Sequence, residues 1–98
     1  MIQHIVCFRF TAGATVAQIA EAGAGLLGMT GRIPDIRRIS FVPNLAPSVT
    51  EYSHVLTVEL DDMAAVQRYA DHPVHVETVA RFLAPIREAR LALDIEAS

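Results

Sequence analysis

The feature that most limits the fold of this chain is a period-two alternation along its first ten residues. One set of alternate side chains comprises Ile2, His4, Val6, Phe8 and Phe10, and the set between them comprises Gln3, Ile5, Cys7 and Arg9. Because successive side chains of a strand point to opposite faces, this pattern predicts a strand with one strongly apolar face. The segments 36–42, 52–60 and 89–95 are also typical of strands, so we expect four strands in total.

A helix is expected between the first two strands. It begins at Thr15, which fits a capping box with Gln18, and it ends around Gly28, Gly31 and Pro34. Its apolar stripe comprises Val16, Ile19, Ala20, Gly23 and Leu26 or Leu27. A loop that carries Pro43, Asn44 and Pro47 is expected between the second and third strands.

Pro73 divides the helical sequence that follows the third strand. Asp61 and Asp62 supply an acidic start for a helix that carries Met63, Val66 and Tyr69 or Ala70. Proline disfavours the α conformation in the residue before it, so this helix should end around His72. A new helix should then begin at Pro73 and run to about residue 84, where Pro85 follows.

The expected element order is β-α-β-β-α-α-β within a single domain, residues 1–98. This order predicts an α+β ferredoxin-like sandwich, with a four-stranded antiparallel sheet and helices on one face only. The other face would then expose apolar side chains such as Ile5, Val55 and Ala92 to water. A second copy of the sheet is the simplest cover, so we expect a homodimer. The face is expected to carry Gln3, Ile5, Cys7, Arg9, Val55, Glu59 and Arg90.

Charge and composition exclude several classes of function. The 98 residues include eight arginines, no lysine and eleven acidic residues, for a net charge of −3. No basic run is present to attract nucleic acid or an anionic membrane, so we expect neither partner. Because the chain has no lysine, Schiff-base chemistry on a lysine side chain is excluded. The apolar stretches are too short to span a membrane and the N-terminus lacks signal-peptide features, so we expect a cytoplasmic protein.

His75 is the strongest candidate for a catalytic residue. If Pro73 is the first helical residue, His75 lies in the first turn, where the positive end of the helix favours a neutral ring. A neutral imidazole can accept a proton, and Tyr69 on the preceding turn could donate a hydrogen bond to the same ligand. The alternative is that His72 and His75 only tie the helix break to the sheet through hydrogen bonds.

Two more histidines lie on the predicted strands among large apolar residues. Because His4 and His54 share their faces with apolar side chains, both are expected to point toward the helices. The residues expected to line a ligand pocket there are His4, Val6, Phe8, His54, Leu56 and His72. The first and third strands should run in opposite directions, so His4 and His54 need not form a pair. Either could equally be a core histidine.

No set of residues predicts a metal or cofactor site. His72 and His75 are spaced like metal ligands, but Pro73 should point their side chains in different directions. Cys7 alternates with large apolar residues and is expected to be a small buried side chain. The glycines at positions 23, 25, 28 and 31 do not match the spacing of a phosphate-binding loop. We therefore expect no cofactor and no bound metal.

Four segments resemble a known family. MIQHIVCFRF, IPDIRRI, EYSHVLTVEL and above all YADHPVHVETVARFLAP are similar to the stress-responsive A/B barrel (Dabb) proteins of the dimeric α+β barrel superfamily. The resemblance implies a homodimer in which two four-stranded sheets pack face to face. One branch of that family comprises cofactor-free polyketide cyclases. There, positions matching His75 and Tyr69 act as an acid/base pair, and positions matching His4 and His54 line the pocket.

Three hypotheses about function follow. The first is a homodimeric protein that binds a small, mainly apolar ligand between sheet and helices. The second is a cofactor-free cyclase, isomerase or similar lyase acting on an enolisable carbonyl compound, with His75 as base and Tyr69 as hydrogen-bond donor. The third is a purely structural dimer whose pocket is filled by its own side chains.

Overall fold

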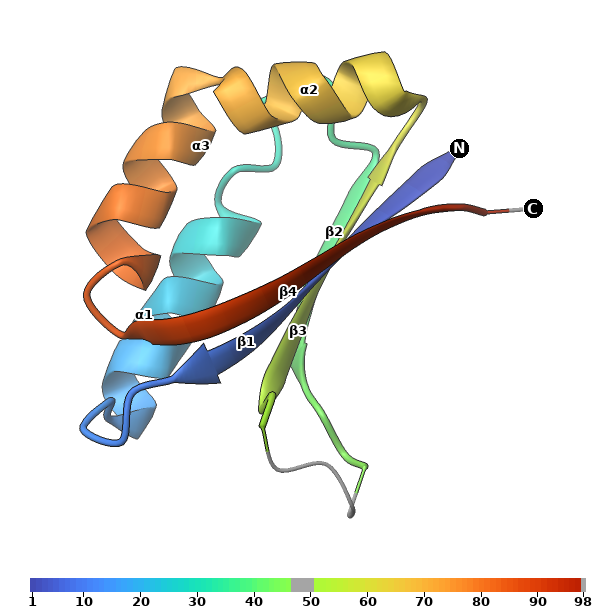
Figure 1. Ribbon diagram of the computed structural model, residues 1–98. Coiled ribbons are helices and arrows are strands. Elements are labelled where there is room, and N and C mark those ends of the chain that lie inside the picture. Colours follow the sequence, from blue (N-terminus) through green and yellow to red (C-terminus); the bar gives the residue numbers. More distant parts are fainter. Residues whose placement is uncertain (47–50, 98) are drawn as a thin grey trace.

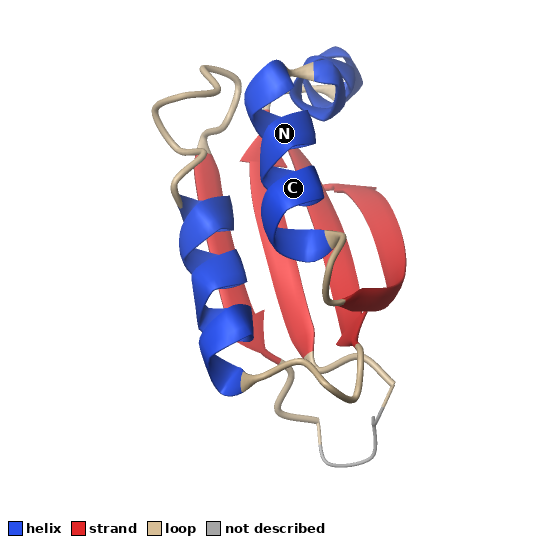
Figure 2. Cartoon of the chain, turned by 90° about the vertical axis from the view of Figure 1, so that its left-hand side faces the viewer, coloured by secondary structure: helices blue, strands red, loops and turns tan. Residues whose placement is uncertain are grey.

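The computed structural model describes residues 1–46 and 51–97 and contains one antiparallel sheet with helices on one face (Figures 1 and 2). The elements are β1 (Ile2–Phe10), α1 (Val16–Leu27), β2 (Arg38–Pro43), β3 (His54–Leu60), α2 (Met63–Asp71), α3 (Pro73–Thr78), the π-helical turn η1 (Val79–Leu83) and β4 (Arg87–Glu96). The strand order is β2-β3-β1-β4. The predicted ferredoxin-like α+β fold is therefore confirmed.

The predicted helix caps are present and explain where the helices begin. The Thr15 hydroxyl accepts a hydrogen bond from the backbone N–H of Gln18, whose side chain accepts one from the backbone N–H of Thr15 in return. Asp62 caps α2, with its carboxylate 2.8 Å from the backbone nitrogen of Ala65. His72 ends α2 with an extended backbone and also caps α3, as the position of Pro73 predicts.

Several element bounds differ from the predicted ones, and β4 begins at Arg87, two residues earlier than expected. Both β2 and β3 begin two residues later than expected, and Ile36 packs into the core instead of joining β2. The last helix is α-helical only to Thr78 and then widens into η1, where the backbone N–H of Ala84 reaches back five residues to the carbonyl of Val79. Pro47 of the predicted loop lies outside the described residues.

The hydrophobic core lies between the sheet and the helices. Its largest fully buried side chains are Tyr69, Phe8, Leu26, Met29, Ile33, Leu60, Leu83 and Val58. Gly25 allows α1 to lie close to η1, because a Cβ atom there would lie 2.6 Å from the ring of Phe82. This close contact brings the side chains of Leu26 and Leu83 to the same region of the core. No helix in the described part of the chain is long and apolar enough to cross a membrane.

The face on which the β4 side chains lie was predicted wrongly. Leu91, Leu93 and Ile95 pair with residues of β1 that lie on the uncovered side of the sheet, and each is nearly half exposed. Arg90 and Ala92 consequently face the helices. Alternation shows which residues of a strand share a face, but only the pairing with β1 decides where that face points.

The uncovered face is more apolar than expected as a result. It carries Ile5, Val42, Val55, Leu91, Leu93 and Ile95. Cys7, which was expected to be buried, is only half-buried there. Exposed apolar area of this kind on a sheet is typical of a surface that packs against another protein surface.

Candidate active site

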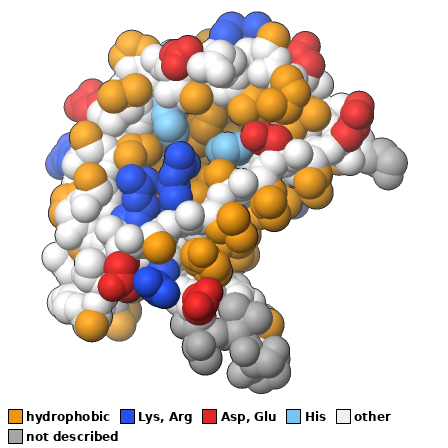
Figure 3. All heavy atoms as spheres, in the orientation of Figure 1, with side chains coloured by type: hydrophobic (Ala, Val, Ile, Leu, Met, Phe, Trp, Pro, Cys, Tyr) orange, Lys and Arg blue, Asp and Glu red, His pale blue; other side chains and the backbone are white. Residues whose placement is uncertain are grey.

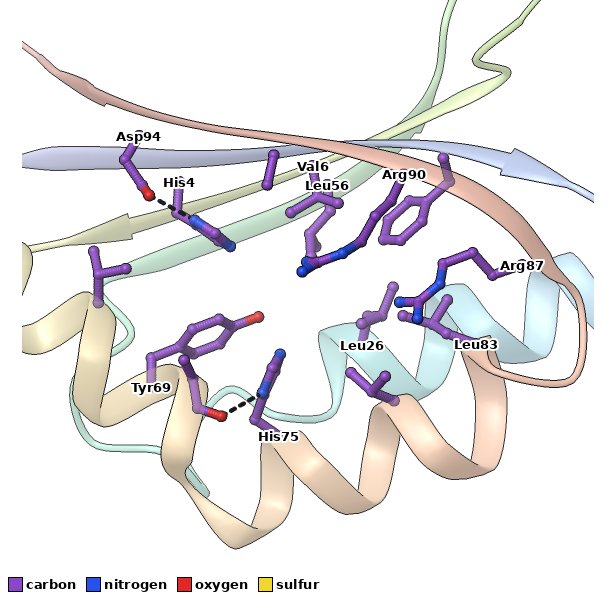
Figure 4. Close-up of a pocket in the computed structure, with 15 residues that line it drawn as sticks. His4, Val6, Leu26, Leu56, Tyr69, His75, Leu83, Arg87, Arg90 and Asp94 are labelled. Carbon is purple, nitrogen blue, oxygen red and sulfur yellow. Dashed lines mark hydrogen bonds and ion pairs between the residues drawn. The ribbon is translucent and has the colours of Figure 1, made fainter.

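A cavity of about 500 Å³ lies between the sheet and the helices (Figure 4). Its aliphatic lining comprises Val6, Leu26, Leu56, Val66, Val79 and Leu83, with Phe8 and two alanines, Ala70 and Ala92. Its polar lining comprises His4, Tyr69, His75, Arg87, Arg90 and Asp94. The volume lies in the range typical of small-molecule sites, so an organic ligand fits.

Tyr69 and His75 face each other because the chain turns sharply at His72. Pro73 ends α2 there and starts α3 in a different direction, so side chains from the two helices meet at the cavity (Figures 1 and 4). Their ring centroids are 4.5 Å apart. The sequence-predicted pair is therefore in direct contact.

The hydrogen bonding of His75 determines its tautomer. Its Nδ1 lies 2.9 Å from the carbonyl oxygen of Ala70, and a carbonyl can only accept, so Nδ1 carries the proton. The remaining nitrogen, Nε2, has a free lone pair and points into the cavity (Figure 4). His75 can consequently accept a proton from a bound molecule without any rearrangement.

Burial is the main cause that lowers the pKa of His75 below the usual value of 6.5, and the positive charge of nearby Arg90 acts in the same direction. The hydrogen bond to Ala70 opposes this shift. From the sequence, the pKa of His75 was expected to be lowered by the positive end of the helix dipole. In the structure α3 has only six residues, and removal of the ring from water accounts for the lowered pKa.

The hydroxyl group of Tyr69 is buried and has no hydrogen-bond partner among the described residues. The residue is 1% exposed, and its oxygen points into the cavity (Figure 4). Burial raises the pKa of this phenol, so it stays protonated and can donate a hydrogen bond. Buried polar groups without partners are rare, and a ligand atom is a natural partner for this one.

His4 forms a second polar pair, with Asp94 of β4. The His4 Nδ1 lies 2.6 Å from the carboxylate, and the His4 ring meets that of Tyr69 edge to face at a centroid distance of 5.7 Å. Because Asp94 accepts from Nδ1, the His4 Nε2 is left free toward the cavity (Figure 4). The pair places a second proton-accepting nitrogen in the same site.

Sequence reasoning missed all three charged cavity residues, Arg87, Arg90 and Asp94. A signal was present, since Arg90 and Asp94 alternate with leucines along the last strand. Two charged residues on one face of a strand predict a solvent-exposed face. Only the pairing with the neighbouring strand shows that this face lines a cavity.

Two of the predicted pocket residues lie elsewhere. His54 stacks on Phe41 at a centroid distance of 5.3 Å and contacts the hydroxyl of Ser53 at 2.8 Å, outside the cavity that contains His4. Burial lowers the pKa of His54. His72 caps α3 through its Nδ1, which accepts a hydrogen bond from the backbone N–H of Val74. The other predicted residues, His4, Val6, Phe8, Leu56, Tyr69 and His75, all line the cavity.

Metal ligands do not cluster in the described ranges, where no three His, Cys, Asp or Glu side chains lie close enough to hold an ion. His72 and His75 differ in role, as the intervening proline predicts, because one caps the helix and the other faces the cavity. The cavity offers donors and acceptors for an organic molecule.

The architecture is that of a ferredoxin-like α+β domain with a cavity between its sheet and its helices. Residues 2–97 match the family model of the stress responsive A/B barrel domain, and the chain belongs to this family. It is 27% identical over 82 residues to the uncharacterised protein SCO4036 of Streptomyces coelicolor. The matched region covers 82% of this chain and 84% of that protein.

Solved structures with the same fold include dimeric proteins. One is a dimeric protein of unknown function from Bacteroides fragilis, 28% identical, with a TM-score of 0.79 over 98% of this chain and 95% of that one. Another is a dimeric ferredoxin-like protein from Thermobifida fusca, 26% identical, with a TM-score of 0.84 over 98% of this chain and 90% of that one.

Proposed function

We propose that the protein is a homodimer that binds a small carbonyl compound in the cavity between sheet and helices. The observation that carries this proposal is the Tyr69 hydroxyl, which is buried, partnerless among the described residues and directed at the cavity beside the free nitrogen of His75. A carbonyl oxygen accepts hydrogen bonds, so it would satisfy the phenol.

The lining also supports a particular shape of ligand. Aliphatic side chains make up most of the wall away from Tyr69 and favour an alkyl chain or ring. An apolar ligand alone would leave the buried phenol without a partner. The cavity therefore suits an amphipathic molecule with its carbonyl group at the Tyr69 end.

A second candidate function is cofactor-free proton transfer at the carbon beside the carbonyl group. It is favoured by the hydrogen bond to Ala70, which leaves the Nε2 of His75 as the acceptor in the cavity. In this step Nε2 takes the proton, the electrons of the C–H bond form the enolate double bond, and the carbonyl oxygen becomes negative. Tyr69 donates a hydrogen bond to that oxygen. This corresponds to the cyclase or isomerase class of reaction.

The dimeric state is supported by the apolar uncovered face and by the dimeric proteins of similar sequence and fold. Two sheets packed face to face would remove Leu91, Leu93 and Ile95 from water, which a single chain leaves nearly half exposed.

Tyr69→Phe tests the binding proposal by moving stability and affinity in opposite directions. Removing a buried hydroxyl that lacks a partner should raise the free energy of unfolding by about 1 kcal/mol. The same change removes the hydrogen bond to the ligand, so calorimetry should show about five- to tenfold weaker binding of methyl 7-oxooctanoate, a neutral enolisable ketone. The control is Tyr52→Phe, which lies outside the cavity. Equal affinity of the Tyr69 variant and the unmodified protein, or no binding to either, would contradict the proposal.

A further inference from the structure

The cavity holds more positive than negative charge, although the chain as a whole is acidic. Four of the eight arginines form ion pairs with surface carboxylates, namely Arg9, Arg37, Arg38 and Arg68. Arg87 and Arg90 line the cavity and form no ion pair among residues 1–46 and 51–97. The one carboxylate in the lining, Asp94, is already bonded to His4.

The backbones of the two arginines lie away from that of Asp94 along β4, but the Arg90 side chain reaches back toward Tyr69 and His75 (Figure 4). Both come from β4, where Arg90 pairs with Phe8 while Asp94 pairs with His4. Four residues of strand separate Arg90 from Asp94, or about 13 Å between their Cα atoms. Figure 4 shows the Arg90 side chain extending from β4 into the cavity, with Arg87 nearer to Leu83. In Figure 3, basic side chains and histidines gather in one hollow beside β4.

We propose that Arg90, assisted by Arg87, binds a carboxylate group on the ligand, so that the substrate class is a keto acid with its carbonyl group at Tyr69 and His75. This inference rests on the proposed function. A guanidinium group matches the two oxygens of a carboxylate, and the aliphatic side chains in the lining suit the carbon chain of the ligand.

The charge balance favours a singly charged group over a phosphate. Two arginines against one carboxylate leave an excess of one positive charge in the lining when both histidines are neutral. A carboxylate neutralises that excess, whereas a phosphate ester carries up to two negative charges near neutral pH. Because Arg90 is exposed to solvent, the attraction is moderate and sets selectivity and orientation rather than very tight binding.

The test compares 7-oxooctanoate with its neutral methyl ester by calorimetry, on the unmodified protein and on Arg90→Gln. The unmodified protein should bind the acid about tenfold more tightly than the ester. Arg90→Gln should remove this preference by weakening only the acid, and Arg87→Gln should change the affinities in the same direction. Arg32→Gln is the matched control, because it deletes the same charge from an exposed residue outside the cavity and should leave both affinities unchanged.

The possible outcomes separate this inference from the proposed function. If acid and ester bind equally and Arg90→Gln affects neither, the carboxylate site is wrong while carbonyl binding stands. If neither probe binds the unmodified protein, both proposals are wrong. If millimolar inorganic phosphate displaces 7-oxooctanoate, the arginines form a general oxyanion site, and the assignment to a keto acid is overturned.

Discussion

Replacing His75 with alanine should slow the exchange of α protons of methyl 7-oxooctanoate for deuterium by about 10² to 10⁴-fold, the usual contribution of a general base. The physical reason is that Nδ1 is held by the carbonyl of Ala70, so Nε2 is the nitrogen available to take the proton. Tyr69→Phe should reduce the rate less, since it removes one hydrogen-bond donor and leaves the base in place. Proton NMR of the ketone in D₂O measures both rates.

The pH dependence of this exchange should identify the same residue. Burial lowers the pKa of His75 below 6.5, so the ring is already mostly neutral at pH 6.5. The rate should therefore rise with pH below 6.5 and be level at neutral pH.

The lowered pKa of His75 also makes the stability of the protein depend on pH. Below 6.5 the unfolded chain takes up the proton before the folded one does, so the free energy of unfolding falls as the pH falls. His54 contributes in the same direction, so His75→Gln should reduce this slope without abolishing it.

His72→Ala is the matched control for the His75 variant. It removes the cap of α3 and should cost about 1 kcal/mol of stability, but it should leave the exchange rate unchanged. A contrary result would be a His75→Ala protein that loses several kcal/mol of stability while its exchange rate and its affinity for the ketone stay the same. His75 would then be a structural tie between the two helices.

Placing a carboxylate on the uncovered sheet face should separate the proposed dimer into monomers. Leu93→Asp and Val55→Asp each put an unpaired charge into the contact, once per protomer, and removal of such a charge from water costs several kcal/mol. We expect the dissociation constant of the dimer to rise by at least about 100-fold. Sedimentation velocity at micromolar concentration would measure this change.

The control for this experiment is Val16→Asp. Val16 is an exposed valine at the start of α1, on the helical side of the molecule, so the same substitution there should leave the oligomeric state unchanged. Circular dichroism should show that all three variants keep their fold. A monomeric mass for the unmodified protein at micromolar concentration would refute the dimer.

Local signals in the sequence determined most of the secondary structure and one half of the site. Thr15, Asp62 and Pro73 act within one or two helical turns of themselves, so their capping and breaking roles are readable without tertiary information. Tyr69 and His75 are six residues apart on either side of the break, and the turn alone brings them together. Strand alternation likewise predicted that His4 and Leu56 face the helices.

The other half of the site was decided by the tertiary structure alone. His4 and Asp94 are 90 residues apart and meet because β1 and β4 pair in one register. A shift of one residue in that register would have put Arg90 and Asp94 on the uncovered face and Leu93 over the cavity. His54 faces the helices as expected and pairs with Phe8, which lines the cavity, but it stacks on Phe41 of β2 and lies outside that cavity. Alternation tells which side chains of a strand lie together, whereas the packing of distant strands decides what they meet.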